Sequence, residues 1–479
     1  MTRPGDDTNA GMLICRAELA FGQWADVRLR HGLIAEIGDL PVVPGERVLD
    51  AAGGLLLPGL HDHHIHVAAC AAALASVQCG PPEVPDDASL ANVLACPGMG
   101  WLRGVGYHES VAGMIDRHWL DAVVTDRPLR VQHRSGRMWV FNSAGLHHIL
   151  ESGIAPPPGL ERQNDQWTGR LYDGDAWLRA ALGSVPPAFD AIGAALARHG
   201  VTGLTDMSPG NDHAMAAHFA AERSRGALPQ RVLLAGRLSL GDHAIDPGLT
   251  VGPVKIHLHE HNLPDYDETV ALIRAAHAQG RGVASHCVTE VELVFTLTAL
   301  AEAGVASGDR IEHASVANPA ALAQLVEMGL PVIAQPNFVA ERGDAYRAQI
   351  PAADWPDLYR LHSLLAAGIV LAGGTDAPFG RADPWAAMAA AVSRRTARGA
   401  LFGNAEALSP EAALALFLAE PLDLSRQRRI VPGAFADLCL LGAPWLKARK
   451  SLSADLVRTT WIGGKPVYDR PDHRIGSAG

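Results

Sequence analysis

The sequence predicts an α/β protein, a (β/α)8 barrel with a smaller sheet domain built from both ends of the chain. Between residues 58 and 424, strand-like runs alternate with Ala-rich helical segments in about eight units. This alternation is typical of a parallel sheet, and eight such units suggest a closed barrel. Residues 11–57 and 425–470 instead hold short strand-like runs with Gly turns. Because chain termini often lie close together, these two segments are expected to form one discontinuous domain.

Size and charge limit the class of protein and its partners. The chain has 479 residues, of which 48% are hydrophobic and 19% charged, so a folded chain with one large and one smaller domain is expected. The formal net charge of -11 argues against nucleic acid or an anionic membrane as partner, because both attract basic patches. The expected partner is a small-molecule substrate, and the composition permits a homodimer.

The cysteine pattern and the N-terminal segment predict a cytoplasmic protein. The six cysteines are scattered without a CxxC pair, as is typical of reduced thiols in a reducing compartment. The N-terminal segment is polar and acidic and lacks the apolar core of a signal peptide. No uninterrupted apolar run reaches membrane-spanning length.

Nine segments of the barrel region have the pattern of strands, which is one more than a barrel needs. They are 57–67, 129–133, 201–206, 231–234, 254–258, 282–286, 310–313, 331–335 and 369–373. We expect either 129–133 or 231–234 to be a peripheral strand. Residues 68–200 are too long for one strand–helix unit, and an insertion at the mouth of a barrel would shape the substrate pocket.

Helices are expected between these strands. The clearest candidates are 269–279, 290–303, 319–328 and 410–418. The last of them should begin at Pro410, with Ser409 as its N-cap, because Ser and Pro are favoured at these two positions.

The stretch LPGLHDHHIHV from Leu57 to Val67 carries the first candidate metal ligands, His64 and His66. Alternate residues of a strand point to the same side, so these two imidazoles converge on one point, whereas His61 and His63 face the other side. Two neutral imidazoles can hold a divalent transition metal. An HxH pair alone is a weak signal, so this interpretation depends on the rest of the chain.

Four later strands carry residues that suit the same site. Lys255 lies in a predicted strand, His286 ends VASH, His313 ends RIEH, and Asp376 follows VLAGGT. Catalytic groups of such barrels lie at the carboxyl ends of the strands, so these side chains are expected to meet. Each alone could be a core histidine, a helix cap or a surface lysine. Six matches in order, each on or just after a strand, favour a shared site.

These motifs resemble the metal-dependent amidohydrolase superfamily, within it amidohydrolase family 3, which includes N-substituted formamide deformylases. The matching pieces are PGLHDHHIH, GVTGLTDMS, VKI, VASHCVTE, DRIEHAS, VIAQPN, GGTDAPFG with DPW, and PGAFADLCLL. They span nearly the whole chain. The resemblance implies a TIM-type barrel over 58–424 that carries a composite β-sandwich made of 11–57 and 425–470.

The resemblance also implies six metal ligands and one or two metal ions per chain. The ligands are His64, His66, Lys255, His286, His313 and Asp376. The HxH pair and Asp376 would bind one ion, the other two histidines a second, and Lys255 would bridge both as a carboxylated lysine. Zinc is the expected metal, with manganese, iron or nickel as alternatives.

Such a site would hydrolyse a carbon–nitrogen bond. Metal coordination makes bound water a nucleophile near neutral pH and polarises a carbonyl, while Asp376 would take the proton of that water and pass it to the leaving nitrogen. One alternative is a deaminase with a single metal and no bridging lysine. Another is a non-catalytic scaffold on the same barrel, which the presence of all six ligands disfavours.

Two departures from the family pattern concern the substrate. Members commonly have Asp-Gly after the strand lysine, but here KIHLHEHN places His257 and His259 on the side of Lys255. These histidines could replace the lysine as ligands or orient the substrate. Relatives usually carry a histidine five positions before the Asn of Asn-Ser-Ala, where this chain has Arg137. Arg137 could bind a carboxylate or phosphate, or it could be an ordinary exposed arginine.

Several other side chains are candidates for the pocket or its surroundings. The pocket candidates are Trp101, His108, Trp139 and Asn142. Glu290 and Glu312 could support the metal ligands or carry protons, and they could equally form salt bridges.

Overall fold

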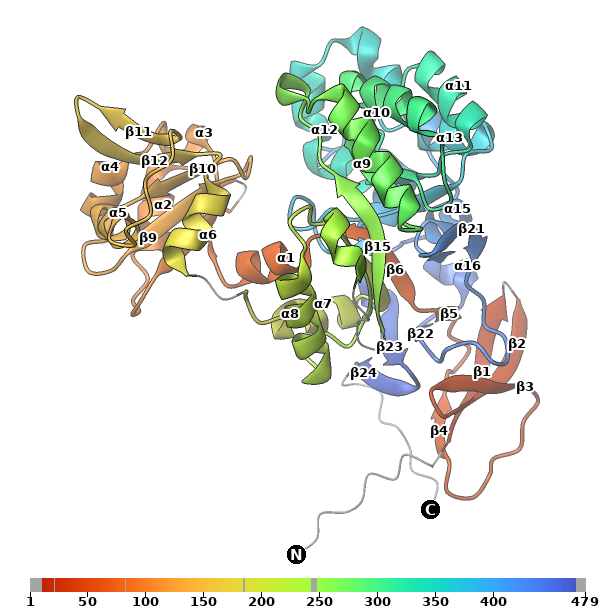
Figure 1. The fold of residues 1–479 in the computed structure, drawn as a ribbon. Coiled ribbons are helices and arrows are strands. Elements are labelled where there is room, and N and C mark those ends of the chain that lie inside the picture. Colours follow the sequence, from red (N-terminus) through yellow and green to blue (C-terminus); the bar gives the residue numbers. More distant parts are fainter. Residues whose placement is uncertain (1–10, 21, 82, 184–185, 243–247, 471–479) are drawn as a thin grey trace, which may run out of the picture. The chain divides into compact units, whose positions relative to one another are not determined.

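A computed structural model describes residues 11–20, 22–81, 83–183, 186–242 and 248–470 (Figure 1). The chain divides into two compact units. The first unit consists of Met1–Val67 and Phe189–Gly479, and the second of Ala68–Ala188. Each unit is described below by itself.

The first unit contains a sheet of eight parallel strands in the described part of the chain. In spatial order they are β6 (Leu60–Ile65), β13 (Val201–Asp206), β14 (Arg231–Gly236), β15 (Leu249–Ile256), β16 (Val283–Cys287), β17 (Arg310–His313), β18 (Val332–Ala334) and β19 (Leu371–Gly373). The two outermost strands also meet, because the Asp376 N–H after β19 donates to the carbonyl of His64 at 2.7 Å. The sheet is therefore a nearly closed barrel, and the predicted TIM-type barrel is confirmed.

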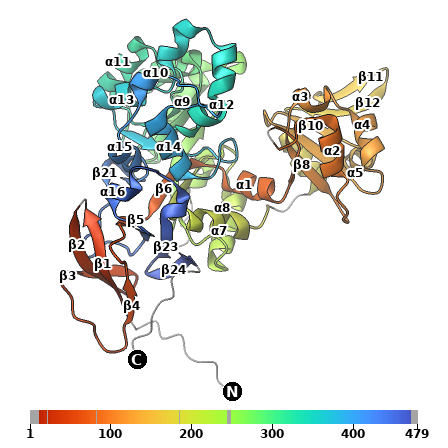
Figure 2. The same ribbon diagram turned by 180° about the vertical axis from the view of Figure 1, so that it is seen from behind.

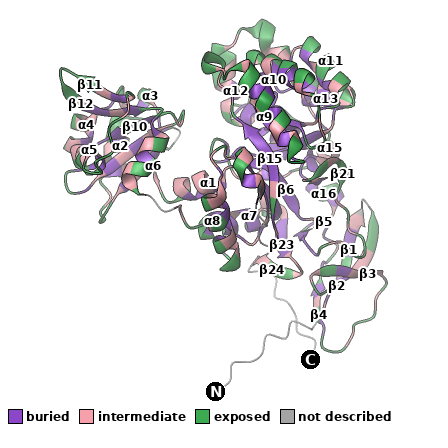
Figure 3. Cartoon of the chain, in the orientation of Figure 1, coloured by how far each residue is buried: buried purple, intermediate pink, exposed green. Residues whose placement is uncertain are grey.

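Helices follow most of the barrel strands. They are α7 (Asp190–Arg198), α8 (His213–Ser224), α9 (Tyr266–Ala278), α10 (Glu290–Ala303), α11 (Pro319–Met328), α12 (Asn337–Gln349), α13 (Leu361–Ala366), α14 (Pro384–Ser393) and α15 (Pro410–Ala415). As predicted, α15 begins at Pro410, and the Ser409 side chain accepts a hydrogen bond from the Ala412 N–H. Figure 3 shows β6 and most of β15 buried, whereas α9 to α11 have exposed residues.

Of the nine predicted strands, 129–133 is the one outside the barrel. It forms β9 (Leu129–His133) in a six-stranded sheet of the second unit. The other strands of that sheet are β7 (Val77–Gln78), β8 (Leu102–Tyr107), β10 (Met138–Phe141), β11 (Leu160–Gln163) and β12 (Gln166–Tyr172). Its sequence LRVQH alternates apolar and polar residues, whereas barrel strands such as β13 are buried at every position. A strand that is covered on both faces is buried at every position, as β13 is, and does not alternate between apolar and polar residues.

Besides a two-stranded sheet of β20 (Ala419–Glu420) and β21 (Asp423–Gln427), the first unit contains two four-stranded sheets (Figure 2). One has the order β3 (Leu33–Gly38), β2 (Gln23–Arg30), β1 (Met12–Ala20) and β4 (Arg47–Asp50). The other has the order β24 (Lys465–Asp469), β23 (Val457–Ile462), β22 (Leu438–Leu441) and β5 (Leu56–Pro58), so it joins both ends of the chain. One hydrophobic cluster includes Ile14 and Val27 of the first sheet with Leu438 and Trp461 of the second.

Two observations bear on the environment of the chain. None of the helices in the described ranges is both long and apolar enough to cross a membrane. All six cysteines are free thiols.

Candidate metal centre

Three of the predicted ligands converge at the open end of β6. The Nε2 atoms of His64 and His66 lie 3.4 Å and 3.1 Å from the same Asp376 oxygen, Oδ1. The possible ligating atoms of these three side chains all lie within 4.8 Å of one another. The two histidines face one point because they are two residues apart at the end of a strand. Two imidazoles and one carboxylate form a donor set that zinc accepts.

The carbonyl of His64 and the backbone at Asp376 hold this arrangement together. Asp376 has a φ of 54°, and His313, a second predicted ligand, has a φ of 72°. Residues with a Cβ rarely adopt this left-handed region, which costs about 1–3 kcal/mol per residue. The hydrogen bond from the Asp376 N–H to His64 offsets part of that cost. Strain of this kind concentrates at functional sites.

Glu312 sets the tautomer of His64. The Nδ1–H of His64 donates to Glu312 Oε2 at 2.5 Å, and Arg310 Nε donates to the other carboxylate oxygen at 2.7 Å. Because the proton of the neutral imidazole is used on Nδ1, Nε2 presents a lone pair toward Asp376. Glu312 therefore supports a predicted ligand and also forms a salt bridge, the two roles the sequence left open.

The remaining predicted ligands lie beside this group. The His313 ring centroid is 4.8 Å from that of His64 and 4.4 Å from that of His286. His313 Nδ1 is 2.7 Å from Gln335 Oε1, which can only accept a hydrogen bond, so the lone pair of the neutral ring is on Nε2. That Nε2 and Lys255 Nζ are buried without a hydrogen-bond partner among the described residues. Buried polar atoms rarely lack partners. A cation bound among these side chains would give both atoms a partner, so the arrangement fits a metal site.

The protonation states also fit a metal site. Burial lowers the pKa of His64, His286 and His313, so the neutral imidazoles are favoured. Burial also lowers the pKa of the Lys255 ammonium. Burial raises the pKa of Asp376, but the nearby His64 and His66 rings lower it by more, and the net pKa is below its ordinary value. Neutral imidazoles and an ionised carboxylate are the forms that ligate metals.

His257 and His259 follow β15, and His257 lies next to the predicted ligand His286. The His257 ring centroid lies 4.8 Å from that of His286 and 4.5 Å from that of His259. Burial and the neighbouring Lys255 lower the pKa of His257 to about 4. The role of these histidines as ligands or substrate contacts stays a prediction.

Arg137, Trp139 and Trp101 belong to the second unit, where each has structural contacts. The Arg137 guanidinium donates to both oxygens of Asp173, at 2.7 Å and 2.6 Å, and Trp139 Nε1 donates to Asp175 at 2.9 Å. The Arg130 guanidinium lies 5.5 Å from the centre of the Trp101 ring. A part for these side chains in substrate binding stays a prediction.

Two other candidates have structural partners. Asn142 is the N-cap of α5 (Ser143–Leu150), where its Oδ1 accepts from Gly145 N–H at 2.8 Å. The exposed Glu290 accepts a hydrogen bond from Asn318 Nδ2.

Asp62 is a site residue that the sequence analysis missed. Its carboxylate accepts hydrogen bonds from the N–H and the hydroxyl of Thr375, at 3.0 Å and 2.6 Å, and from the His64 N–H at 3.2 Å. It thereby joins β6 to the loop that carries Asp376. The signal was available, because Asp62 shares a strand face with His64 and His66.

Asp206 and Ser208 are two more residues of the site that the sequence analysis missed. Asp206 accepts from the Val67 N–H at 2.7 Å, directly after the HxH pair, and from the Ser208 N–H at 3.0 Å. The Ser208 hydroxyl lies 3.1 Å from His66 Nδ1. The sequence motif GVTGLTDMS holds both residues, but their partners His66 and Val67 come directly after another strand, β6.

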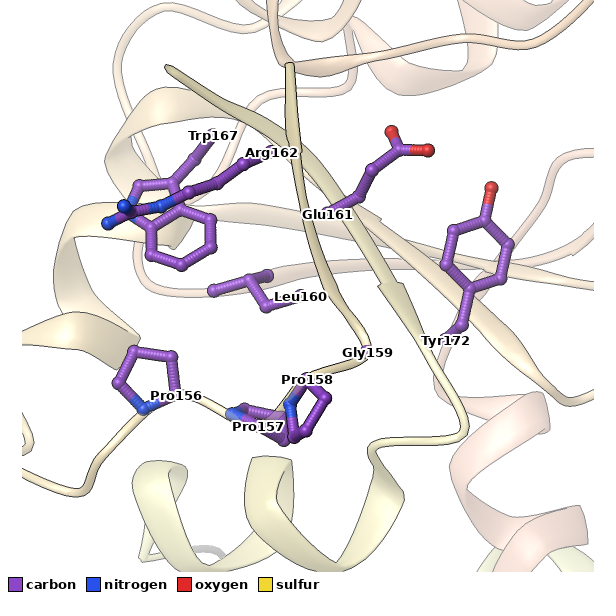
Figure 4. A pocket seen from close by; sticks show the side chains of 9 residues that line it. All are labelled: Pro156, Pro157, Pro158, Gly159, Leu160, Glu161, Arg162, Trp167 and Tyr172. Carbon is purple, nitrogen blue, oxygen red and sulfur yellow. The ribbon is translucent and has the colours of Figure 1, made fainter. Parts of the chain in front are cut away.

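A surface pocket of about 630 Å³ lies elsewhere, in the second unit (Figure 4). Its lining includes three consecutive prolines at 156–158, Trp167 and Tyr172. The Arg162 guanidinium stacks on Trp167 at 3.8 Å from the ring centre. None of the predicted site residues lines this pocket.

Comparison with known proteins agrees with this fold. The model of the amidohydrolase family matches residues 47–468. YtcJ of Bacillus subtilis (strain 168), named as an amidohydrolase, is 24% identical over 493 residues, covering 89% of this chain and 91% of that protein. N-substituted formamide deformylase of Arthrobacter pascens is 24% identical over 495 residues, with the same coverage of both chains.

Solved structures share the fold. A metal-dependent hydrolase from Pyrococcus horikoshii OT3 has a TM-score of 0.75 at 20% identity, covering 93% of this chain and 100% of that one. A metal-dependent hydrolase from Pyrococcus furiosus has a TM-score of 0.72 at 21% identity, covering 90% and 99%. With the family model matched over most of its length, the chain belongs to the amidohydrolase family and is a hydrolase that acts on carbon–nitrogen bonds.

Proposed function

We propose that the substrate is a small molecule with a non-peptide carbon–nitrogen bond, in an amide, an N-formyl compound or a cyclic amide. The observation that carries this proposal is the convergence of His64, His66 and Asp376 beside two buried polar atoms, Lys255 Nζ and His313 Nε2, which have no hydrogen-bond partner in the described part of the chain. The N-formyl class is included because one relative is an N-substituted formamide deformylase. The net charge of -11 supports a small-molecule partner over nucleic acid.

A divalent cation, most simply zinc, would be held by His64, His66 and Asp376. A second would be held by His286 and His313. When bound, such ions lower the pKa of a water molecule and polarise the substrate carbonyl. The nitrogen and oxygen donors present suit zinc.

The protein groups would hold and move protons around these ions. Glu312 keeps the proton of His64 on Nδ1 through the 2.5 Å hydrogen bond, so Nε2 stays available. Asp376, held ionised by the two adjacent imidazoles, would accept a proton at Oδ1 or Oδ2 and deliver it to the leaving nitrogen.

Lys255 would serve as an anionic bridge after carboxylation. Burial lowers the pKa of its ammonium, and the neutral amine would attack carbon dioxide to form an N–C bond. The nitrogen then loses a proton to solvent, and the product is a carbamate anion. This reaction would use the Nζ atom that has no partner among the described residues.

A mononuclear deaminase is the second candidate. It is favoured by one observation: among the His, Cys, Asp and Glu side chains of the described residues, the tight ligand cluster in the barrel consists of His64, His66 and Asp376, without His286 or His313. Such an enzyme would need one ion and no carbamate.

Metal analysis together with a hydrolysis screen tests these proposals. The purified full-length protein is analysed for bound metal and assayed on N-acyl, N-formyl, cyclic imide and aminated-ring compounds, before and after chelation. Two ions per chain in the barrel and release of an amine with a carboxylate or formate are expected. One barrel ion with ammonia release and no carboxylate would indicate the deaminase, and turnover that survives complete chelation would refute both.

We further infer three features of the molecule around this site. The two small sheets would form the composite β-sandwich, as their shared hydrophobic cluster suggests. Residues 68–200 would shape the substrate pocket. The protein would work in the cytoplasm, which is supported by its six free thiols, and it could do so as a homodimer.

A further inference from the structure

A second cluster of metal-ligating side chains lies in the other unit of the chain. His108 directly follows β8, His133 is the last residue of β9, and Glu109 begins α3 (Glu109–Ala112). β8 and β9 are parallel neighbours in which Tyr107 is paired with His133. The carboxyl ends of both strands therefore lie at the same edge of the sheet, and the two imidazoles stack with centroids 5.8 Å apart.

Both imidazoles direct Nε2 at the Glu109 carboxylate. His133 Nε2 is 2.9 Å from Oε2, and His108 Nε2 is 3.5 Å from Oε1. The possible ligating atoms of the three side chains all lie within 4.8 Å of one another. Among the described residues, the other set of side chains whose ligating atoms lie this close together is that of His64, His66 and Asp376 in the barrel.

The same local motif, His-x-Ser, surrounds both histidines. Nδ1 of His108 is 2.8 Å from Ser110 Oγ, and Nδ1 of His133 is 2.8 Å from Ser135 Oγ. The backbone N–H of each serine also reaches that Nδ1, at 3.2 Å and 3.1 Å. A hydroxyl oxygen can accept a proton from Nδ1–H. The serine N–H groups are donors, so Nδ1 accepts in this structure and each neutral ring carries its proton on Nε2, toward Glu109. Binding a cation through Nε2 would therefore require each ring to move that proton to Nδ1, where the serine hydroxyl oxygen can accept it.

From these contacts we propose that His108, His133 and Glu109 form a binding site for a divalent first-row transition metal, such as zinc, that is separate from the barrel site. Two imidazoles and one carboxylate match the ligands of three-residue zinc sites, and the remaining coordination positions would be filled by water. The serine hydroxyls would hold the rings in position, as the second partners of metal-bound histidines do. Partial exposure of the side chains, 21% for His108 and 16% for His133, gives an ion access from solvent.

The test counts zinc bound to the full-length protein after chelation and dialysis against micromolar free zinc. Wild type is compared with Glu109→Gln and with a His108→Asn/His133→Asn double variant. The control is His147→Asn/Glu151→Gln, because these residues form an exposed i,i+4 pair in the same unit. About half of the Glu109 side chain is exposed (51%), so Glu109→Gln is not expected to disturb the fold. Near-UV circular dichroism checks this for every variant.

Both site variants are expected to bind one zinc ion fewer per chain than wild type, and the control the same number as wild type. Zinc should also slow hydrogen exchange in peptides covering 104–111 and 131–136 of wild type, and not in Glu109→Gln. Equal zinc counts in wild type and the site variants would overturn the proposal. A loss in the control as large as that in the site variants would also overturn it, because that would indicate non-specific surface binding. None of these readouts depends on turnover in the barrel.

Discussion

At the scale of single residues, the candidate site depends on which ring nitrogen of each histidine carries the proton. Glu312 accepts from His64 Nδ1 and Gln335 from His313 Nδ1, so both rings present Nε2 to the centre of the group. Asp62 does not ligate, yet it positions His64 and Thr375 through three hydrogen bonds. The candidate ligands are thus oriented by residues that hydrogen-bond to them, namely Glu312, Gln335 and Asp62.

Replacing Glu312 by Gln should weaken zinc binding in the barrel. His64 and Arg310 donate to different oxygens of Glu312. Gln has an amide NH2 in place of one of them, and with its oxygen turned toward Arg310 it no longer holds His64 in the required tautomer. We expect an affinity loss of about 10–100-fold, measured by competition with a zinc-binding dye. Glu290→Gln is the matched control, because Glu290 is an exposed carboxylate on α10. An unchanged affinity in Glu312→Gln would contradict the role given to this residue.

Lys255 is the second residue whose role can be measured directly. Protein equilibrated with 13C-bicarbonate should show a carbamate carbonyl resonance, because the buried neutral amine can react with carbon dioxide. We expect the resonance to disappear in Lys255→Ala and to persist in Lys450→Ala, where the lysine removed is exposed. A resonance that survives in Lys255→Ala, or none in wild type, would rule out the carbamate and favour a single-ion site.

At the scale of elements, the loops after the barrel strands are held by helix caps. α10 follows the His286 strand and begins with a capping box, in which Thr289 and Glu292 satisfy each other's backbone N–H groups. Glu292 also accepts from the Val288 N–H at 2.7 Å and from the Glu260 N–H at 3.0 Å. The cap therefore connects the loop after β16 with the loop after β15, which carries His257 and His259.

Removing this cap should loosen the loop without unfolding the barrel. Thr289→Ala loses the side-chain acceptor of the Glu292 N–H, which typically costs about 1 kcal/mol, or about fivefold in local hydrogen-exchange protection. This loss of hydrogen-exchange protection is measured by mass spectrometry on the peptide covering 287–293. Thr298→Ala is the control, since that hydroxyl is exposed and donates to a carbonyl of its own helix, that of Val294. Equal protection in both variants would show that the cap does not hold the loop.

At the scale of the whole molecule, the chain has two units with separate hydrophobic cores. The cores of the second unit lie entirely within Ala68–Ala188 and include the fully buried Tyr107 and Phe141. A unit with its own core can fold alone in principle. The barrel ligands all lie in the first unit.

A fragment of Ala68–Ala188 is expected to unfold cooperatively in urea. Phe141→Ala should lower its free energy of unfolding by about 3–5 kcal/mol, because truncation of a buried aromatic ring leaves a cavity. Met99 is 98% exposed, so Met99→Ala should change that free energy by less than about 0.5 kcal/mol. A fragment without a cooperative transition would mean that this unit needs the rest of the chain to fold.

The sequence by itself determined the barrel and the order of its candidate ligands. Strand and helix periods are local properties, so alternating segments can be recognised without the fold, and parallel strands bring their carboxyl ends to one edge. That is why His64, His66 and Asp376 could be expected in one site although more than 300 residues separate the pair from Asp376. That the three would bind the same ion was implied by the family resemblance. The half-exposed pattern of 129–133 could also have identified it as the strand outside the barrel.

Only the tertiary structure decided which side chains support those ligands. Glu312 is 248 residues from His64, and Asp62 is 313 residues from Thr375. Such pairs depend on which strands become neighbours and how far each strand is shifted, and no local pattern encodes either. The same holds for His108, Glu109 and His133, which meet because the pairing of β8 with β9 places Tyr107 opposite His133. The physical reason is that periodicity acts within a segment, whereas hydrogen-bond partners across a barrel are chosen by the packing of the whole chain.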